Sequence, residues 1–389
     1  MIPQANRLEA FEEGIFQVLN EKKEELIKAG RTVYNLSVGT PDFKPANHII
    51  EAVSKACQDP ANYKYALRDI PELIDAVITR YKKRYGVELL SDEVMSVYGS
   101  QEGIAHVCLS LVDPGDIILV PNPGYPIFNY GALLAGADIK TYDLNADNGY
   151  LPDLDELAKT YGHKAKVMLV SYPLNPVCKC APRSFYEKLI KFAKDNDIFI
   201  IHDNAYSDII YDGRKGESIL SLEGAKDVCV EFYSLSKSFN YTGARMSFVT
   251  GNKTAIKGFK KLRSQIDYGT FLPVQIGAVA ALTGPDDMVI KQCKDYQDRR
   301  DALCGGLRSI GWHIEDSEGT MFAWAKIPAK FGDDDTAFVM ELMDKSGVIC
   351  TPGSSFGSLG KGYVRFALTM TVEEINCAVK SIKECGILS

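Results

Sequence analysis

Short apolar runs alternate with amphipathic segments through most of the chain. Seven of these runs have the length and the β-branched or aromatic content of buried strands. They lie at residues 94–98, 117–120, 137–142, 166–171, 198–202, 228–233 and 246–250. A helical pattern at residues 71–85 precedes the first run, and others at residues 104–111 and 184–196 lie between runs. This alternation predicts an α/β fold, with a mostly parallel sheet between layers of helices.

The C-terminal third of the chain has a different pattern. A charged helix is predicted near residues 287–307, and a terminal helix over residues 372–385. Between them lie three short apolar runs, at residues 322–325, 348–351 and 363–367. We expect them to form a small α+β domain that is built from both termini.

The N-terminal segment is expected to join that small domain. Residues 8–30 predict an amphipathic helix with Phe11, Ile15, Val18, Leu19 and Leu26 on one face, and a short strand is predicted over 34–38. The predicted domains are therefore a large one at residues 41–289 and a discontinuous small one at residues 1–40 and 290–389.

Composition and charge exclude several classes of protein. The chain has 389 residues, of which 46% are hydrophobic and 24% charged, as in ordinary globular proteins. Its net charge of −7 argues against a nucleic-acid surface. No apolar run reaches membrane-spanning length, and no signal-peptide pattern opens the chain. The ten cysteines are scattered, and Cys178-Lys179-Cys180 lacks the partners of a zinc site. We therefore expect a cytoplasmic protein without a metal, nucleic-acid or membrane partner.

The most informative residue is Lys237, which follows the apolar run at residues 228–233 and the polar break Ser234-Leu235-Ser236. A lysine that leaves a core strand loses hydration, so that its amine can lose its proton and form an imine with a carbonyl group. The serine hydroxyls and Arg245, eight positions later, suit a phosphate dianion. Together they suit pyridoxal phosphate. An ordinary lysine in a polar turn has the same local pattern, so the rest of the chain has to decide.

Other polar residues follow predicted strands. Ser100 and Gln101 lie in a glycine turn that opens a helix, where free backbone amides favour an anion. Tyr125 follows the strand at residues 117–120, at the edge where α/β sheets bind ligands. Asp203 ends a fully apolar strand, where it either caps the next helix or faces a cationic ring nitrogen.

In their order along the chain, these pieces resemble the class I/II aminotransferases of pyridoxal-phosphate fold-type I. The resemblance rests on Asn175-Pro176, Asp203-x-x-Tyr206, Ser234-x-Ser236-Lys237, Arg245 and Arg365. The surrounding residues are most similar to the branch that holds alanine aminotransferases and LL-diaminopimelate aminotransferases. The resemblance implies a seven-stranded, mostly parallel sheet in the large domain.

The resemblance also implies roles around the cofactor ring. Lys237 would bind the cofactor covalently and move the substrate proton, with Asp203 and Tyr206 as the other catalytic residues. Asp203 would pair with the ring nitrogen, and Tyr206 and Asn175 would bind the ring's phenolic oxygen. Tyr125 would stack on the ring.

Further roles concern the phosphate and the substrate. By the resemblance, the phosphate would be held by Ser100, Gln101, Ser234, Ser236 and Arg245. Tyr65 would reach the phosphate from the partner subunit of a homodimer. Arg365, with Asn175 and the backbone of Gly39, would bind the substrate α-carboxylate.

The chain departs from the family pattern at several positions. Val177 stands where threonine is usual, Ala244 where tryptophan is usual, and Ser247 where glycine is usual. The segment 65–71 is one residue short and lacks its glycine. These changes bear on the cofactor surroundings and on the loop expected to face the substrate.

The implied function is transfer of an amino group from an L-amino acid, of the alanine or LL-diaminopimelate type, to a 2-oxo acid such as 2-oxoglutarate or pyruvate. The alternative is a pyridoxal-phosphate-dependent carbon–sulfur β-lyase on the same fold. A third reading, a cofactor-binding regulator, is disfavoured because such regulators carry an added DNA-binding domain, whereas here the fold begins almost at residue 1 and the chain is acidic.

Overall fold

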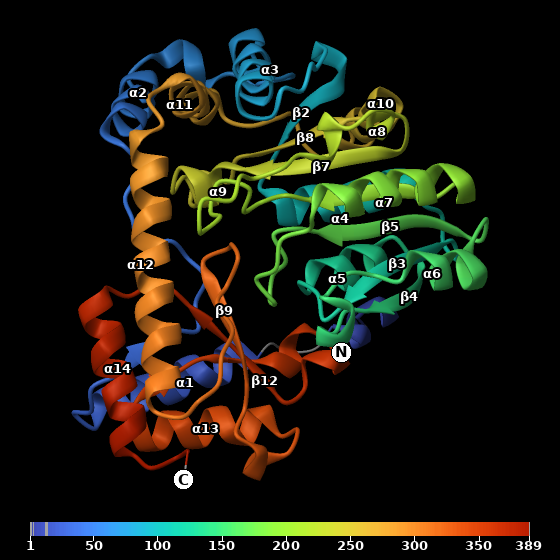
Figure 1. Ribbon diagram of the computed structural model, residues 1–389. Coiled ribbons are helices and arrows are strands. Elements are labelled where there is room, and N and C mark those ends of the chain that lie inside the picture. Colours follow the sequence, from blue (N-terminus) through green and yellow to red (C-terminus); the bar gives the residue numbers. More distant parts are fainter. Residues whose placement is uncertain (1, 3, 12–14, 389) are drawn as a thin grey trace.

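A seven-stranded sheet forms the centre of the larger of two lobes in the computed structural model, which describes residues 2, 4–11 and 15–388 (Figure 1). Only β8 runs against its neighbours, because its pairs with β2 and β7 are antiparallel and the remaining pairs are parallel. The strand order is β2 (Val94–Val97), β8 (Ser247–Gly251), β7 (Cys229–Ser234), β6 (Phe199–Asp203), β5 (Ala165–Ser171), β3 (Ile117–Asn122) and β4 (Asp138–Asp143). The predicted α/β class and mostly parallel sheet are confirmed.

Helices cover both faces of this sheet (Figure 1). The helices of this lobe are α2 (Asn47–Cys57), α3 (Pro71–Tyr85), α4 (Ser100–Leu111), α5 (Ile127–Leu134), α6 (Leu154–Tyr161), α7 (Arg183–Asn196), α8 (Ala225–Val228), α9 (Leu235–Ser238), α10 (Lys253–Arg263) and α11 (Leu272–Thr283). Helix α3 shows how local sequence sets the bounds: it begins with a proline and ends at Gly86, whose φ of 68° suits a residue without a Cβ.

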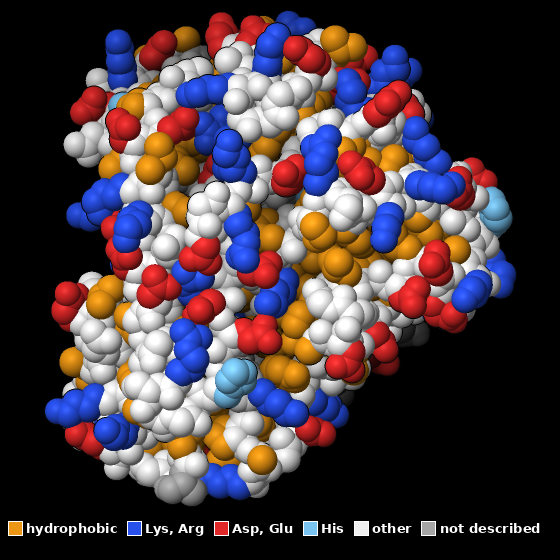
Figure 2. Space-filling model, in the orientation of Figure 1, with side chains coloured by type: hydrophobic (Ala, Val, Ile, Leu, Met, Phe, Trp, Pro, Cys, Tyr) orange, Lys and Arg blue, Asp and Glu red, His pale blue; other side chains and the backbone are white. Residues whose placement is uncertain are grey.

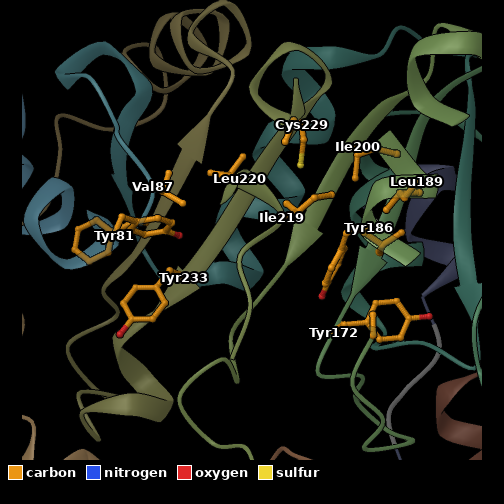
Figure 3. Close-up of a cluster of buried hydrophobic side chains, with 14 of the residues drawn as sticks. Tyr81, Val87, Tyr172, Tyr186, Leu189, Ile200, Ile219, Leu220, Cys229 and Tyr233 are labelled. Carbon is orange, nitrogen blue, oxygen red and sulfur yellow. The ribbon is translucent and has the colours of Figure 1, made fainter. Parts of the chain in front are cut away.

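The strands are apolar because both of their faces are covered. Ile200 of β6 and Leu189 of α7 are fully buried in one core cluster, and Figure 3 shows them beside Tyr186. Val167 and Leu169 of β5 are buried in a second cluster. A sheet that is buried on both faces leaves only its strand ends open for polar side chains, which favours a ligand site there.

The smaller lobe contains segments from both ends of the chain. Its antiparallel sheet has the order β11 (Thr351–Pro352), β12 (Tyr363–Ala367) and β9 (Phe322–Lys326), and β1 (Tyr34–Asn35) pairs with β10 (Val348–Ile349). Helices α1 (Ile15–Lys28), α13 (Asp335–Ser346) and α14 (Val372–Glu384) surround these strands. The long helix α12 (Asp287–Ser309) runs along both lobes (Figure 1). We propose that the large domain comprises residues 41–289 and the small domain residues 1–40 and 290–389.

The predicted N-terminal helix over residues 8–30 is only partly right. Residues Asn6–Ala10 form a 3-10 helix, α1 begins at Ile15, and residues 12–14 lie outside the described residues. Leu19 and Leu26 are buried, whereas Val18 is 47% exposed and does not lie on the buried face. The strand predicted over 34–38 is shorter as well, because only Tyr34 and Asn35 pair with β10.

The surface carries both signs of charge. On the face shown in Figure 2, Lys and Arg side chains are interspersed with Asp and Glu. Among the described residues, no helix combines the length and the apolar character needed to cross a membrane.

Candidate active site

A cavity of about 400 Å³ lies at the carboxyl ends of the parallel strands, beside residues of the small lobe. It brings together all the residues singled out in the sequence except Tyr65. They are Gly39, Ser100, Gln101, Tyr125, Asn175, Asp203, Tyr206, Ser234, Ser236, Lys237, Arg245 and Arg365. Segments from both lobes therefore build one site.

Lys237 lies in the short helix α9, directly after β7. Its Nζ donates a hydrogen bond of 2.8 Å to the Gly39 carbonyl oxygen and lies 6.0 Å from the centroid of the Tyr206 ring. Burial, together with the positive charges of Arg365 and Arg245, lowers the pKa of Lys237 to about 8. About a tenth of the amine is therefore unprotonated at pH 7, and the unprotonated amine is the form that acts as a nucleophile or a base.

This lowered pKa predicts a pH-dependent stability in the cofactor-free protein. The folded protein releases the Lys237 proton near pH 8, whereas the unfolded chain releases it near 10.5. The penalty for burying the charge is thus complete below pH 8 and is relieved as the pH rises toward 10.5. Cofactor-free Lys237→Met should be more stable than wild type at pH 7 by up to about 3 kcal/mol. Urea unfolding near pH 7 and near pH 10 tests this, and an equal difference at both pH values would contradict it.

Asp203 ends β6 and is 7% exposed. Burial raises the pKa of its carboxyl group to about 6, although His202, a backbone amide at Ala205 and Lys237 oppose the shift. Its Oδ1 has no hydrogen-bond partner among the described residues. A buried carboxylate oxygen without a partner fits a cationic ring N–H that enters the cavity.

His202, the residue before Asp203, belongs to a different network. It is fully buried, and its Nδ1 lies 3.0 Å from a carboxylate oxygen of Glu231. Glu231 also accepts hydrogen bonds from Tyr81 and Ser218. His202 is therefore a satisfied core residue.

One end of the cavity is suited to an anion. Ser100 opens helix α4, and its buried Oγ has no partner among the described residues. The Arg245 guanidinium lies against Gly99, where an added Cβ would be 2.3 Å from Arg245 Nη2. Gly99 also has a φ of 86°, a backbone conformation that favours glycine. A helix N-terminus, a free hydroxyl and a guanidinium are groups that suit a phosphate.

Ser234 and Ser236 complete this end of the cavity. The Ser234 Oγ accepts hydrogen bonds from the Ser236 backbone at 3.2 Å and from the Ser247 Oγ at 3.0 Å. Ser247, which replaces the usual glycine, thus orients Ser234 from the neighbouring strand β8. Val177, another departure from the family pattern, is buried at 4% exposure.

Arg365 lies on β12 and faces the cavity from the small lobe. It donates a hydrogen bond of 2.9 Å to Asn175 Oδ1. Its Cζ lies 4.0 Å from the ring centroid of Phe322 and 4.6 Å from that of Phe356. Burial lowers the pKa of Arg365 to about 10, so the guanidinium remains charged at neutral pH. Aromatic rings pack against its plane, and its N–H groups have the geometry that suits a carboxylate.

Phe322 and Phe356 are site residues that the sequence pattern did not identify. Phe322 packs against the Arg365 guanidinium and also makes an edge contact with the Tyr206 ring, with 5.9 Å between the ring centroids. A Cβ on Gly39 would lie 2.5 Å from Phe322 Cζ, so the backbone of Gly39 needs glycine here. For Phe322, the only sequence signal was the apolar strand predicted at residues 322–325, which indicates burial and does not indicate a role in the site.

Tyr125 and Tyr65 lie in different surroundings. The Tyr125 hydroxyl donates to Gln101 Oε1 at 3.2 Å, and Tyr125 lines the cavity. Tyr65 is 78% exposed and lies outside this cavity, with its ring 5.3 Å from that of Tyr268. Within one chain, the structure does not bring Tyr65 to the site.

The comparison with protein families covers most of the chain. The family model described as "Aminotransferase class I and II" matches residues 31–382. This range contains all thirteen residues singled out in the sequence.

Individual proteins are similar over nearly the whole chain. The LL-diaminopimelate aminotransferase of Moorella thermoacetica is 38% identical over 98% of this chain and 97% of its own. That of Aquifex aeolicus is 40% identical, with 97% and 98% covered. Among solved structures, substrate-bound BacF from Bacillus subtilis is 34% identical, with a TM-score of 0.94 and coverage of 99% and 98%. A probable N-succinyldiaminopimelate aminotransferase from Thermus thermophilus has a TM-score of 0.89 at 32% identity, with 95% and 100% covered.

Proposed function

Because the chain belongs to the class I and II aminotransferases, we propose that its amino donor is LL-diaminopimelate or a closely related L-amino acid. The protein is a pyridoxal-phosphate-dependent aminotransferase. The observation that supports the donor is the 38–40% identity to LL-diaminopimelate aminotransferases over nearly the full length. The comparisons give no support to the carbon–sulfur lyase.

The donor is tested by comparing kcat/KM for LL-diaminopimelate and for L-alanine, each with 2-oxoglutarate and with pyruvate as acceptor. We expect LL-diaminopimelate to be the better donor by at least about tenfold, because discrimination between side chains arises from a few contacts. A higher kcat/KM for L-alanine would assign the enzyme to the alanine type instead. Release of pyruvate and ammonia from a cysteine conjugate, in the absence of a 2-oxo acid acceptor, would support the carbon–sulfur β-lyase activity instead.

The residues of the cavity fit pyridoxal phosphate. The unpaired oxygen of Asp203 suits the ring N–H, and the unpaired Ser100 hydroxyl with Arg245 suits the phosphate. When bound, the cofactor supplies an electron sink for the substrate's Cα. We assign Tyr206 and Asn175 to its phenolic oxygen, and Tyr125 to its ring face.

The chain's own residues supply binding, orientation and proton transfer. Lys237 Nζ, whose pKa is near 8, would take the proton from the substrate Cα and deliver it to the cofactor carbon that bears the transferred amino group. Arg365 holds the α-carboxylate with two N–H groups, and this restricts the orientation of the Cα–H bond. Asp203 keeps a negative charge in a dry position, where its attraction for a cation is strong.

We expect Arg245 to strengthen cofactor binding through the cofactor's phosphate group. Arg245→Gln removes the positive charge, and it should raise the Kd for pyridoxal phosphate about 10- to 100-fold, since charge-assisted hydrogen bonds are lost. The Kd for pyridoxal, which lacks the phosphate, should stay the same. Fluorescence titration of the cofactor-free protein measures both. An equal loss for the two ligands would mean that Arg245 does not contact the phosphate.

We propose that the active form is a homodimer in which Tyr65 reaches the partner's phosphate. Apolar side chains are exposed around this residue: Leu67 is 74%, Tyr268 59% and Phe271 40% exposed. Such a patch is typical of an interface. Leu67→Glu should produce monomers in analytical ultracentrifugation, and Tyr65→Phe should weaken phosphate binding about tenfold without changing the mass. A monomeric wild type with full activity would contradict this.

We also propose a cytoplasmic location for the enzyme. All ten cysteines are free, as expected in a reducing compartment. Thiol titration of the denatured protein, without a reductant, should find ten thiols. Fewer thiols in freshly purified protein would argue for an oxidising compartment.

A further inference from the structure

Asn122 joins the two lobes beside the active site. It is the last residue of β3 and is 7% exposed. Its Oδ1 accepts a hydrogen bond from the Leu359 backbone at 3.1 Å, and its Nδ2 donates to Ser358 Oγ at 2.8 Å. Nearby, the Gly124 N–H donates to the Phe356 carbonyl oxygen at 2.8 Å. Three hydrogen bonds thus link residues 122–124 of the large lobe to the small-lobe segment 353–360, here called the clamp loop.

The clamp loop is firmly attached to the small lobe. Asp335, which is 2% exposed, accepts hydrogen bonds from the backbone and hydroxyl of Ser354 at 3.0 and 2.6 Å, and from the Gly362 backbone at 3.2 Å. The backbones at the two ends of the loop are in contact, since a Cβ on Gly353 would lie 2.1 Å from the Gly360 oxygen. Because the loop is held on its own lobe, its contact with Asn122 fixes one lobe against the other.

The loop fits closely around the amide. Gly357 has a φ of 121°, and a Cβ there would lie 2.4 Å from Asn122 Oδ1. The amide therefore uses its acceptor and a donor on the clamp loop while the loop backbone lies directly against it. An aliphatic side chain of the same size would leave the Leu359 amide without this partner.

The segments on both sides of this contact contribute residues that line the active-site cavity. Tyr125, three residues after Asn122, lines the cavity from the large lobe, and Phe356 of the clamp loop packs against Arg365 from the small lobe. Asn175, the hydrogen-bond partner of Arg365, also belongs to the large lobe. The position of Phe356 relative to Asn175 therefore depends on how the lobes are joined.

We propose that Asn122 is a positioning residue for the substrate carboxylate: it fastens the clamp loop so that Phe356 holds Arg365 toward the pocket. Lobe closure that aligns catalytic groups is a general device in enzymes with two lobes. The inference rests on the proposed role of Arg365 and concerns how that role is maintained.

Three variants separate this role from a merely structural one. Asn122→Ala removes both side-chain hydrogen bonds to the clamp loop. Ser358→Ala removes only one and changes an exposed residue, so its folding is not at risk. Asn122→Asp keeps the shape and can accept from both the Leu359 amide and the Ser358 hydroxyl, so it serves as the conservative rescue.

The first readout is the split between KM and kcat. Asn122→Ala should raise KM for the amino donor about tenfold, the cost of two neutral hydrogen bonds, and change kcat much less. Ser358→Ala should raise KM about threefold, and Asn122→Asp should stay closest to wild type. The slow reaction with a simple amine that lacks the α-carboxylate should be unchanged in all three. Parallel losses for amine and amino acid would overturn the proposal.

The second readout does not depend on amino transfer. Calorimetry with the 2-hydroxy acid analogue of the donor, which has the carboxylate but no amine, should show about tenfold weaker binding to Asn122→Ala holoenzyme. Hydrogen exchange should accelerate at the Leu359 amide and not across the sheet. Unchanged binding or unchanged exchange would refute the role of Asn122. A wild type that binds the analogue but transfers no amino group would refute the proposed function and leave that of Asn122 standing.

Discussion

Replacing Lys237 with alanine is expected to lower the rate of amino transfer by about 10³-fold or more, with pyridoxal phosphate still able to bind. The reason is that Lys237 Nζ is the buried amine at the end of β7 whose pKa lies near 8. Asp203 and Arg245, two charged groups that are also assigned to the cofactor, cannot replace it as a base and nucleophile. Stopped-flow measurement of a single half-reaction isolates this step.

Two controls sharpen this prediction. Lys253→Ala changes an exposed lysine at the start of α10 and should leave the rate unchanged. A small amine such as methylamine should partly restore the rate of Lys237→Ala, because it can enter the space left by the side chain and accept the proton. Near wild-type transfer by Lys237→Ala without added amine would remove Lys237 from the mechanism.

Replacing Arg365 with lysine is expected to lower kcat/KM for the amino donor about 10²- to 10³-fold, nearly as much as alanine does. A lysine keeps the charge, but it has neither the planar fork that binds a carboxylate with two N–H groups nor the flat face that packs between Phe322 and Phe356. Most of the loss should be in KM. Steady-state kinetics with increasing donor concentration measures it.

The matched control for Arg365 is a change of substrate. An amine without an α-carboxylate should react equally slowly with wild type and with Arg365→Lys, because it has no carboxylate for residue 365 to bind. The affinity for pyridoxal phosphate should also stay unchanged, because Arg365 is assigned to the substrate. If Arg365→Lys retained wild-type kcat/KM, the α-carboxylate would have to bind elsewhere in the cavity.

The large lobe could be predicted from the sequence because its strands are buried on both faces. The run at residues 228–233 became β7, and the run at 198–202 became β6, each within one residue at both ends. Asp203 directly follows the run at 198–202, and Lys237 follows the run at 228–233 after Ser234-Leu235-Ser236, so their place at the edge of the sheet was also predictable. The antiparallel direction of β8 could not be predicted, because an apolar run does not indicate in which direction its strand crosses the sheet.

Contacts between distant segments could not be predicted from local patterns. Arg365 meets Asn175 across 190 positions of sequence, and only the resemblance to a family suggested a shared site. The packing of Arg365 between Phe322 and Phe356, and the contact of Asn122 with the clamp loop, join residues from separate strands and loops. Sequence patterns identify these residues only as apolar or polar, and their pairing arises from tertiary packing.

The prediction of the N-terminal helix was partly wrong for a similar reason. Val18 was assigned to the apolar face by periodicity, yet α1 begins at Ile15 and turns this side chain outward. The effect of Ser247 also required the structure, because its hydroxyl donates to Ser234 on the neighbouring strand.

The most direct test of the central claim is the visible absorption spectrum of the purified protein with pyridoxal phosphate, before and after LL-diaminopimelate is added. We predict a visible band of the bound cofactor that bleaches with the amino acid and returns with 2-oxoglutarate or pyruvate, as expected when an amino group moves to the cofactor and on to the acceptor. Lys237→Ala should not show this cycle. A wild-type protein that forms no such band with added cofactor would contradict the account, because Lys237 would then be only a buried lysine after a strand.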